Sequence, residues 1–316
     1  MAARLTDVLR SDRAVVLIAI QPDAETFVMP TPADYLQLRN PVLEPLAHGT
    51  IELNEVCQRL GSKLKGLTGQ YVKFSCEAVF RGAVPGTLKP NVAAALRCCG
   101  LAENVDEAGA KSIYSPIDGG FESASMIVNM DGNKHALFGV KGKVSAEWPT
   151  NDYPRFKFEF LGLYVDPVYE AMPQTPCFAP PKPLPVSHAN TEWELHGITT
   201  ALYSLSVDIA TNPELRDVPG QYEIEINTRS VSGSLEFAAS RVDKKNWFQT
   251  VRDSETGVFR VKHGNTSGNI IECVASNVQL LEPKYGDQNK RRSNSFNMNI
   301  MPSPVQGEHE IAFIFN

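Results

Sequence analysis

The chain has 316 residues, of which 42% are hydrophobic and 21% charged, with a net charge of −6 and a pI near 5.6. This composition is typical of a soluble folded protein with one large domain or two ordinary ones. An acidic chain lacks the net basic surface with which proteins usually grip nucleic-acid phosphates. The apolar stretch from Ala14 to Ile20 is too short for a transmembrane helix, so we expect no membrane binding and synthesis in the cytoplasm.

The first half is predicted to consist of strands with one helix. In chain order we expect a strand at Val72–Phe80, a helix at Pro90–Cys99, a hairpin at Met126–Val144 that turns at Asp131-Gly132-Asn133, and a strand at Arg155–Leu161. In the last strand three phenylalanines alternate with Lys157 and Glu159. This alternation indicates an antiparallel sheet with one face on a core and one in water.

The second half repeats this order of elements. We expect a strand at Ser232–Ala239, a helix at Asp243–Val251 capped by Asp243, a hairpin turning at Gly264–Asn269, a loop at Pro283–Lys290 and a strand at Ser295–Met301. Strict alternation also marks Tyr203–Ile209 and Tyr222–Ile226. We therefore predict a mainly β chain with two tandem β-sandwich or barrel domains, each with one packed helix, related as a pseudo-twofold repeat.

Two segments fall outside the repeat. Residues 21–70 contain Pro30, Pro32, Pro41 and Pro45 and are predicted to form a long extended loop, within which residues 53–64 fit either helix or strand. Residues 167–185 contain seven prolines and are predicted to be a semi-rigid linker. The expected domains are thus residues 1–166 and 186–316.

Motifs that carry chemistry are not evident. The sequence has no phosphate-binding glycine loop, nucleophile elbow or zinc-protease helix, and its six histidines form no pair at metal-ligand spacing. We therefore expect no catalytic, cofactor or metal site. The six cysteines fit buried thiols in a reducing compartment, with Cys98 and Cys99 as one core and one half-exposed residue. Lys290-Arg291-Arg292 fits a solvated loop or a subunit contact better than a phosphate site.

A series of short motifs resembles those of siphovirus tail tube proteins. Leu96–Glu103 is similar to the family's LLRACGLAET stretch, and Lys157–Tyr164 to its KFEFTGLY stretch. Further similar segments follow in the family's order, at Tyr114–Ser123, Asp131–Val144, Leu205–Asp208, Thr228–Gly233 and His263–Asn269. The chain departs from the family at Cys98, where a small residue is usual, and at the basic stretch Asn289–Asn294.

The resemblance implies a structural protein of the virion tail with two fused tube domains and no enzymatic activity. Such subunits form rings that stack into a conduit, so two domains per chain imply a homotrimeric, pseudo-hexameric ring. The implied partners are further copies of the chain, the tape measure, terminator and distal tail proteins, and double-stranded DNA that passes through the lumen without specific binding. No cofactor is implied.

Two sets of residues are predicted to serve this function. Acidic or neutral polar side chains on the wet faces of strands are candidates to line the lumen, because they do not hold phosphates: Asp208, Glu223, Glu225, Asn297 and Asn299. The segment 21–70 is the candidate for contacts with other subunits or the next ring, through Pro30, Tyr35, Leu36, Pro41 and Leu53.

Three other readings stay open at this point. Another tube-fold component, such as a distal tail or secretion-tube protein, would share the strand pattern. A carbohydrate-binding β-sandwich protein would also fit, although its binding site would need clustered aromatics and Trp148, Trp193 and Trp247 are far apart in the sequence. An enzyme with an unrecognised site is the third.

Overall fold

A computed structural model of the chain describes residues 8–23, 26–56, 58, 61–176, 181–303 and 310–316. Up to residue 169 its elements are β1 (Ala14–Ile20), η1 (Pro32–Asp34), β2 (Arg39–Glu52), β3 (Lys65–Val79), α1 (Ala93–Arg97), β4 (Leu101–Asp106), β5 (Lys111–Pro116), β6 (Ala124–Met130), β7 (Asn133–Pro149), β8 (Arg155–Leu163) and β9 (Val168–Tyr169). The mainly β prediction is confirmed.

After residue 190 the elements are β10 (Thr191–Leu195), β11 (Leu202–Asp208), β12 (Pro213–Val218), β13 (Gln221–Ile226), β14 (Ser232–Ala238), α2 (Trp247–Arg252), β15 (Thr256–His263), β16 (Ile271–Gln288), β17 (Arg291–Ile300) and β18 (Ala312–Phe315). The predicted strands at 155–161, 232–239 and 295–301 and both predicted helices therefore exist. The hairpin at 126–144 also forms, with β6 and β7 joined at Asp131 and Gly132.

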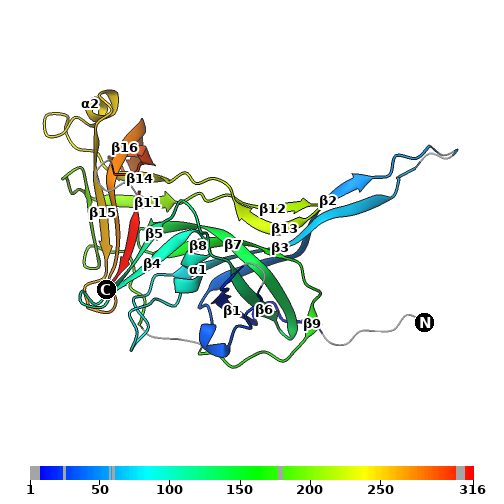
Figure 1. Cartoon of the computed structure of the whole chain (residues 1–316). Coiled ribbons are helices and arrows are strands. Elements are labelled where there is room, and N and C mark those ends of the chain that lie inside the picture. Colours follow the sequence, from blue (N-terminus) through cyan, green and yellow to red (C-terminus); the bar gives the residue numbers. More distant parts are fainter. Residues whose placement is uncertain (1–7, 24–25, 57, 59–60, 177–180, 304–309) are drawn as a thin grey trace.

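The main sheet contains the same four-strand order twice. Its strands run β2-β3-β8-β7-β11-β14-β17-β16, followed by β18-β5-β4 (Figure 1). The first unit, β2-β3-β8-β7, matches the second, β11-β14-β17-β16, strand for strand in sequence order. Flanking strands match too, since β6 pairs with β7 as β15 pairs with β16, while β1 pairs with β6 as β10 pairs with β15. This topology is the three-dimensional form of the repeat in the sequence.

The two units share one sheet and one core. β7 of the first unit pairs with β11 of the second, and the C-terminal β18 inserts between β16 and β5. One hydrophobic cluster contains residues from Val16 to Phe315. The predicted division into residues 1–166 and 186–316 stays a prediction, since these contacts join the two units.

Aromatic side chains on the inner face of the sheet form the core. Phe158 stacks on Phe160 with ring centroids 5.4 Å apart, and Phe156 contacts Phe80 at 4.3 Å. The ring of Phe313, on β18, meets Phe156 edge to face at 5.4 Å. These side chains are at most 2% exposed. The period-2 alternation of the strands follows from this one-sided burial.

The two helices are short and occupy equivalent places in the repeat. α1 follows β3, and the carbonyl at its end, on Cys98, accepts a hydrogen bond from the Gly142 amide of β7. α2 follows β14 and buries Trp247 against Phe237, with ring centroids 5.3 Å apart. Asn246 caps α2 through its side chain, so the prediction of Asp243 as the N-cap was wrong.

Two predicted loops are strands in the structure. Residues 21–70 are not one long loop, because 39–52 and 65–79 pair as the arms of the β2–β3 hairpin. Both faces of the outer part of this hairpin are exposed, so its sequence lacks the alternation that reveals a half-buried strand. Residues 283–288 belong to β16. The strand accommodates the proline at 283 because this residue lies at a β-bulge between Leu281 and Lys284.

The hairpins of the two units differ in the continuity of their strands. β2 and β3 continue without interruption into an arm that projects from the body (Figure 1). In the second unit the corresponding strands are divided into β11 and β12 and into β13 and β14, with Ala210 at a positive φ of 44° in the first break. The β12–β13 hairpin packs against β3, β7 and β8 of the first unit, on the same side of the molecule as the β2–β3 arm (Figure 1).

Candidate assembly and lumen surface

The outer face of the main sheet is polar across seven strands. Directly paired residues share a face, so the register defines rows of neighbouring side chains. One row crosses six strands and consists of Lys157, Ser145, Asp208, Ser232, Asn299 and Gln279. The next row consists of Arg155, Glu147, Ser206, Ser234 and Asn297. This polar sheet face joins the two units without a break.

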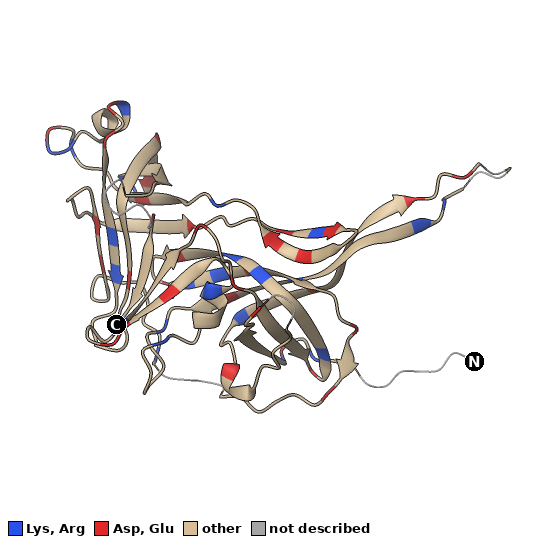
Figure 2. Ribbon diagram, viewed as in Figure 1, with Lys and Arg blue, Asp and Glu red and all other residues tan. Residues whose placement is uncertain are grey.

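The part of this face on the first unit carries paired charges. Arg155 lies 3.0 Å from Glu147 and Lys157 2.5 Å from the same carboxylate. Lys143 and Lys73 lie 3.3 and 3.6 Å from Glu159. Figure 2 shows basic and acidic positions interspersed along these strands. Each of these cations faces a carboxylate, which leaves no isolated positive charge in the group.

The second unit presents serine, asparagine and acidic side chains instead. The Ser206 and Ser234 hydroxyls are 2.8 Å apart, and the Asn297 amide donates to Glu282 at 3.1 Å. Glu236 accepts from Ser293 at 2.5 Å. This half of the polar sheet face therefore offers short hydroxyl and amide groups to whatever lies over it.

The β12–β13 hairpin places acidic side chains at one end of the face. Burial lowers the pKa of Lys141, while the nearby carboxylates of Glu223 and Glu225 act to raise it. Gln221 donates to both carboxylates, and Arg216 lies 2.6 Å from Glu225. The hairpin thus packs its acidic side chains beside a half-buried lysine.

The five lumen candidates are divided between the polar sheet face and the β12–β13 hairpin. Asp208, Asn297 and Asn299 belong to the polar sheet face itself. Glu223 and Glu225 lie on the hairpin that covers its end, beside Lys141. All five are exposed or half-buried. Sequence reasoning missed the serines of β11 and β14 and the charged pairs of β7 and β8, although the same alternation marks them.

The five contact candidates are divided between the body and the β2–β3 arm. Pro30 and Leu36 are buried, and the Leu36 amide donates to Val16, so these two predicted contact residues are unavailable to another subunit. The Tyr35 carbonyl accepts from the Asn91 side chain. Pro41 lies half-buried on β2, and Leu53, near the tip, is 48% exposed. Residues 53–56 and 58 are neither helix nor strand.

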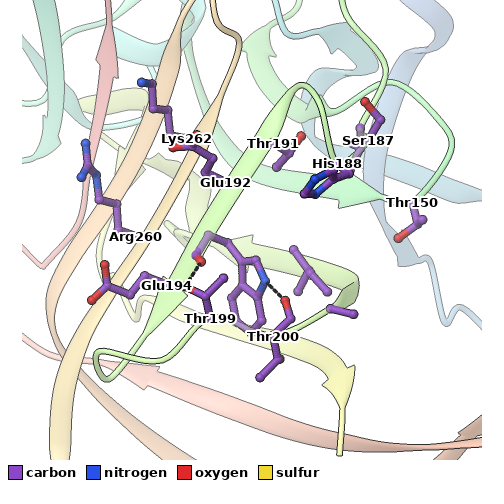
Figure 3. A pocket seen from close by; sticks show the side chains of 14 residues that line it. Thr150, Ser187, His188, Thr191, Glu192, Glu194, Thr199, Thr200, Arg260 and Lys262 are labelled. Carbon is purple, nitrogen blue, oxygen red and sulfur yellow. Dashed lines mark hydrogen bonds between the residues drawn. The ribbon is translucent and has the colours of Figure 1, made fainter.

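A groove lies where the two units meet. It has a volume of about 700 Å³, and its walls come from the Thr150 turn, residues 186–188, β10, β15 and the segment 199–202 (Figure 3). Glu192 is paired in register with Lys262, and Glu194 with Arg260. Trp193 is 7% exposed and donates through Nε1 to the Thr200 carbonyl at 2.6 Å. The other two tryptophans are also buried, so none of the three offers the exposed aromatic platform that a carbohydrate site needs.

The four described cysteines, Cys76, Cys98, Cys99 and Cys273, are buried, which agrees with the prediction for these four; Cys57 and Cys177 lie outside the described residues. Cys98 and Cys99 are both fully buried, so the prediction of one half-exposed cysteine was wrong. Burial raises the pKa of the Cys76 thiol to about 12. Among the described residues, no group of three or more His, Cys, Asp and Glu side chains could hold a metal ion. Within the same residues, no helix is long and apolar enough to cross a membrane.

Comparison with known proteins decides what this architecture is. The family model described as "Phage tail tube protein" matches residues 40–299, which is most of the chain. The chain belongs to the phage tail tube protein family. A search of curated proteins finds no match.

Membership of this family indicates a structural role. A phage tail tube protein is a structural component of the virion tail that self-assembles into a tube with other tail proteins. The matched residues include both four-strand units and most of the β2–β3 arm.

Proposed function

We propose that the protein is the tube subunit of a long, non-contractile siphovirus tail, in which three chains close into a pseudo-hexameric ring. Rings stack into a conduit whose inner wall is the polar sheet face, and the genome passes through it. The observation that carries this proposal is the repeated four-strand order with a polar face continuous across both units. Two equivalent units per chain give six per ring from three copies.

The chemistry of the polar sheet face suits transport of DNA without binding. Phosphate binding requires cations that can exchange counterions for phosphate. Here the lysines and Arg155 of β3, β7 and β8 lie against carboxylates, and the second unit offers serine and asparagine. A duplex would therefore meet a hydrated surface on which these cations are already paired with carboxylates, and along which it slides.

The β2–β3 arm is the proposed contact with a neighbouring subunit or the next ring. Apolar side chains along it are strongly exposed, with Ile51 at 63%, Leu64 at 75% and Leu67 at 48%. Exposed apolar surface of this kind marks interaction sites. Deletion within the arm tests this contact. Deletion of residues 30–45, which lie in the same predicted contact segment, would instead remove the buried Leu36 and the start of β2.

Electron microscopy and native mass spectrometry test the proposal. Purified protein, concentrated until it assembles, should give hollow tubes in negative stain, and single rings released from them should contain three chains. Replacement of residues 53–64 by a short glycine-serine turn should leave the unassembled chain folded and abolish tubes. Monomers at high concentration, or rings of six chains, would contradict the tube or its stoichiometry respectively.

A further inference from the structure

The two units of one chain meet at a junction that can be described strand by strand. One edge of β7 is used twice, first by β6, which pairs with residues 133–140, and then by β11, which pairs with residues 145–149. In this junction Asp208 is opposite Ser145, and Ser206 opposite Glu147. The Thr150 hydroxyl donates to the Tyr203 carbonyl at its end. β11, the first strand of the second unit in sheet order, thus pairs with the free part of the edge of β7, the last strand of the first unit in sheet order.

The equivalent edge of β16 is only half occupied. β15 pairs with residues 271–279 of β16, as β6 does with β7. From 280 to 288 no described strand pairs with that edge, where β11 would lie by analogy. Exposure differs accordingly: β7 is buried or half-buried at every position from 141 to 149, whereas Leu281 to Tyr285 are all exposed. The end of β16 is therefore a strand without its second neighbour.

The opposite end of the sheet carries the complementary edge. β2 is the first strand of its unit, as β11 is of the second, and it pairs only with β3 among the described strands. Val42 on this strand is 63% exposed, and Leu46 36%. An unpaired strand edge with exposed apolar side chains favours pairing with another chain.

We propose that β2 of one copy pairs antiparallel with residues 281–288 of β16 of the next copy, and that this junction repeats the one between β7 and β11. The partner is a second copy of this chain, because the matching first strand already lies inside the chain and is shown to fit a β7-type edge. The contact is heterologous, so it adds copies in one direction until the ring closes. The inference rests on the proposed ring and specifies how its subunits join.

The internal repeat also sets the register. The last residues of β3 and β14, Val79 and Ala238, pair with Arg155 and Ser293. Lys73 is six residues before the end of β3, and Ser232 is six residues before the end of β14. Glu44 pairs with Lys73 and Asp208 pairs with Ser232, so, with the two strand ends aligned, Glu44 is the equivalent of Asp208.

The same alignment makes Lys284 the equivalent of Ser145, since their partners on β17 and β8 are Ser295 and Lys157. The junction between copies therefore places Glu44 opposite Lys284. Both side chains are exposed in the single chain, and among the described residues the ion pair of Lys284 is with the exposed Glu282, at 3.3 Å. Opposite charges directly across an antiparallel pair stabilise it, so the register deduced from topology is also favourable in charge.

Disulfide cross-linking in assembled tubes tests this register. Directly opposite residues in antiparallel strands have Cα atoms about 4.5–5.5 Å apart, within the range that a disulfide spans. The double variant Glu44→Cys/Lys284→Cys should form covalent rings on mild oxidation, seen as a ladder of multimers without reductant. Each single variant should stay monomeric. The matched control Asp208→Cys/Ser145→Cys probes the internal junction and should close a disulfide within one chain, assembled or not.

The outcomes separate this inference from the proposed function. Tubes in which the internal control closes but the 44/284 pair does not would overturn the junction and leave the tube intact. Cross-linking of Glu44→Cys to itself would overturn it as well, since that requires a symmetric contact. Failure of the wild-type chain to form any ring or tube would refute the proposed function and the junction together. Charge reversal is a second readout: Glu44→Lys should slow assembly, and Glu44→Lys/Lys284→Glu should restore it.

Discussion

Replacement of Phe313 tests whether the two four-strand units fold as one body. Phe313 lies on the C-terminal β18, is fully buried, and its ring contacts Phe156 of the first unit edge to face at 5.4 Å. The backbone of β18 pairs with β16 of the second unit and with β5. Phe313→Ala therefore opens a cavity at a point that touches both units.

The expected cost is large relative to the stability of the chain. Truncation of a fully buried phenylalanine to alanine costs about 3–5 kcal/mol, to which the lost edge-to-face contact contributes. Total stability of a folded protein is about 5–15 kcal/mol. Ile314→Ala is the matched control, since Ile314 is half-buried on the other side of β18 and should cost about 1 kcal/mol.

Urea unfolding of the unassembled chain gives the magnitude, and native-state hydrogen exchange shows where protection is lost. We expect β8 and β14 to lose protection by the same amount in Phe313→Ala, because β18 couples the two units. A loss below about 1 kcal/mol would refute the packing argument. A loss confined to β16 and β18, with β8 unchanged, would refute the shared core and support two independent domains.

Three further predictions concern the sheet and its polar face. Arg155→Met removes the 3.0 Å ion pair with Glu147 from a site where the Arg155 side chain is 16% exposed. Urea unfolding should show that the free energy of unfolding falls by about 1–3 kcal/mol, and by less at high salt. An unchanged free energy of unfolding would contradict this prediction. Burial lowers the pKa of His263, so the unfolded chain binds more protons than the folded chain does, and stability should fall as the pH drops through about 6.5. This group contributes at most about 1.4 kcal/mol per pH unit to that fall. His263→Gln should flatten the dependence of stability on pH, and an unchanged dependence would rule the group out. Ser206→Arg/Ser234→Arg adds two cations to the polar sheet face, so assembled tubes should bind short duplex DNA in a salt-dependent way. Binding equal to that of the wild type would show that these residues do not face the lumen.

Much of the sheet could be predicted because burial of one face of a strand makes apolar and polar residues alternate in its sequence. Phe156, Phe158 and Phe160 alternate with charged residues, and the Asp131-Gly132 turn joins two strands. The repeat of element order was visible for the same reason. What could not be predicted is the joining of the units, since the β7–β11 pairing and the insertion of β18 beside β5 are long-range contacts without a local pattern.

The β2–β3 arm and the end of β16 were missed for a different physical reason. Both are strands with exposed residues on both faces, so neither shows alternation, and prolines at 41, 45 and 283 suggest loops. Pro41 and Pro45 lie on an edge strand with register shifts, and Pro283 lies at a bulge, which are the places where sheets tolerate proline. Strands that are exposed on both faces thus resemble loops in a single sequence.

For the candidate site, side-chain chemistry was readable and its arrangement was not. Asp208, Asn297 and Asn299 were correctly read as wet-face residues, but only the register shows that they lie in adjoining rows of one face. Leu36 was read as a contact residue because the segment around it is irregular, although its side chain is buried in the core.

Electron cryo-microscopy of assembled tubes tests the central claim most directly. The account predicts threefold rings whose inner wall is the polar sheet face, with Ser206, Ser234 and Asn297 lining the channel. It would be contradicted by tubes in which this face points outward or is buried between rings.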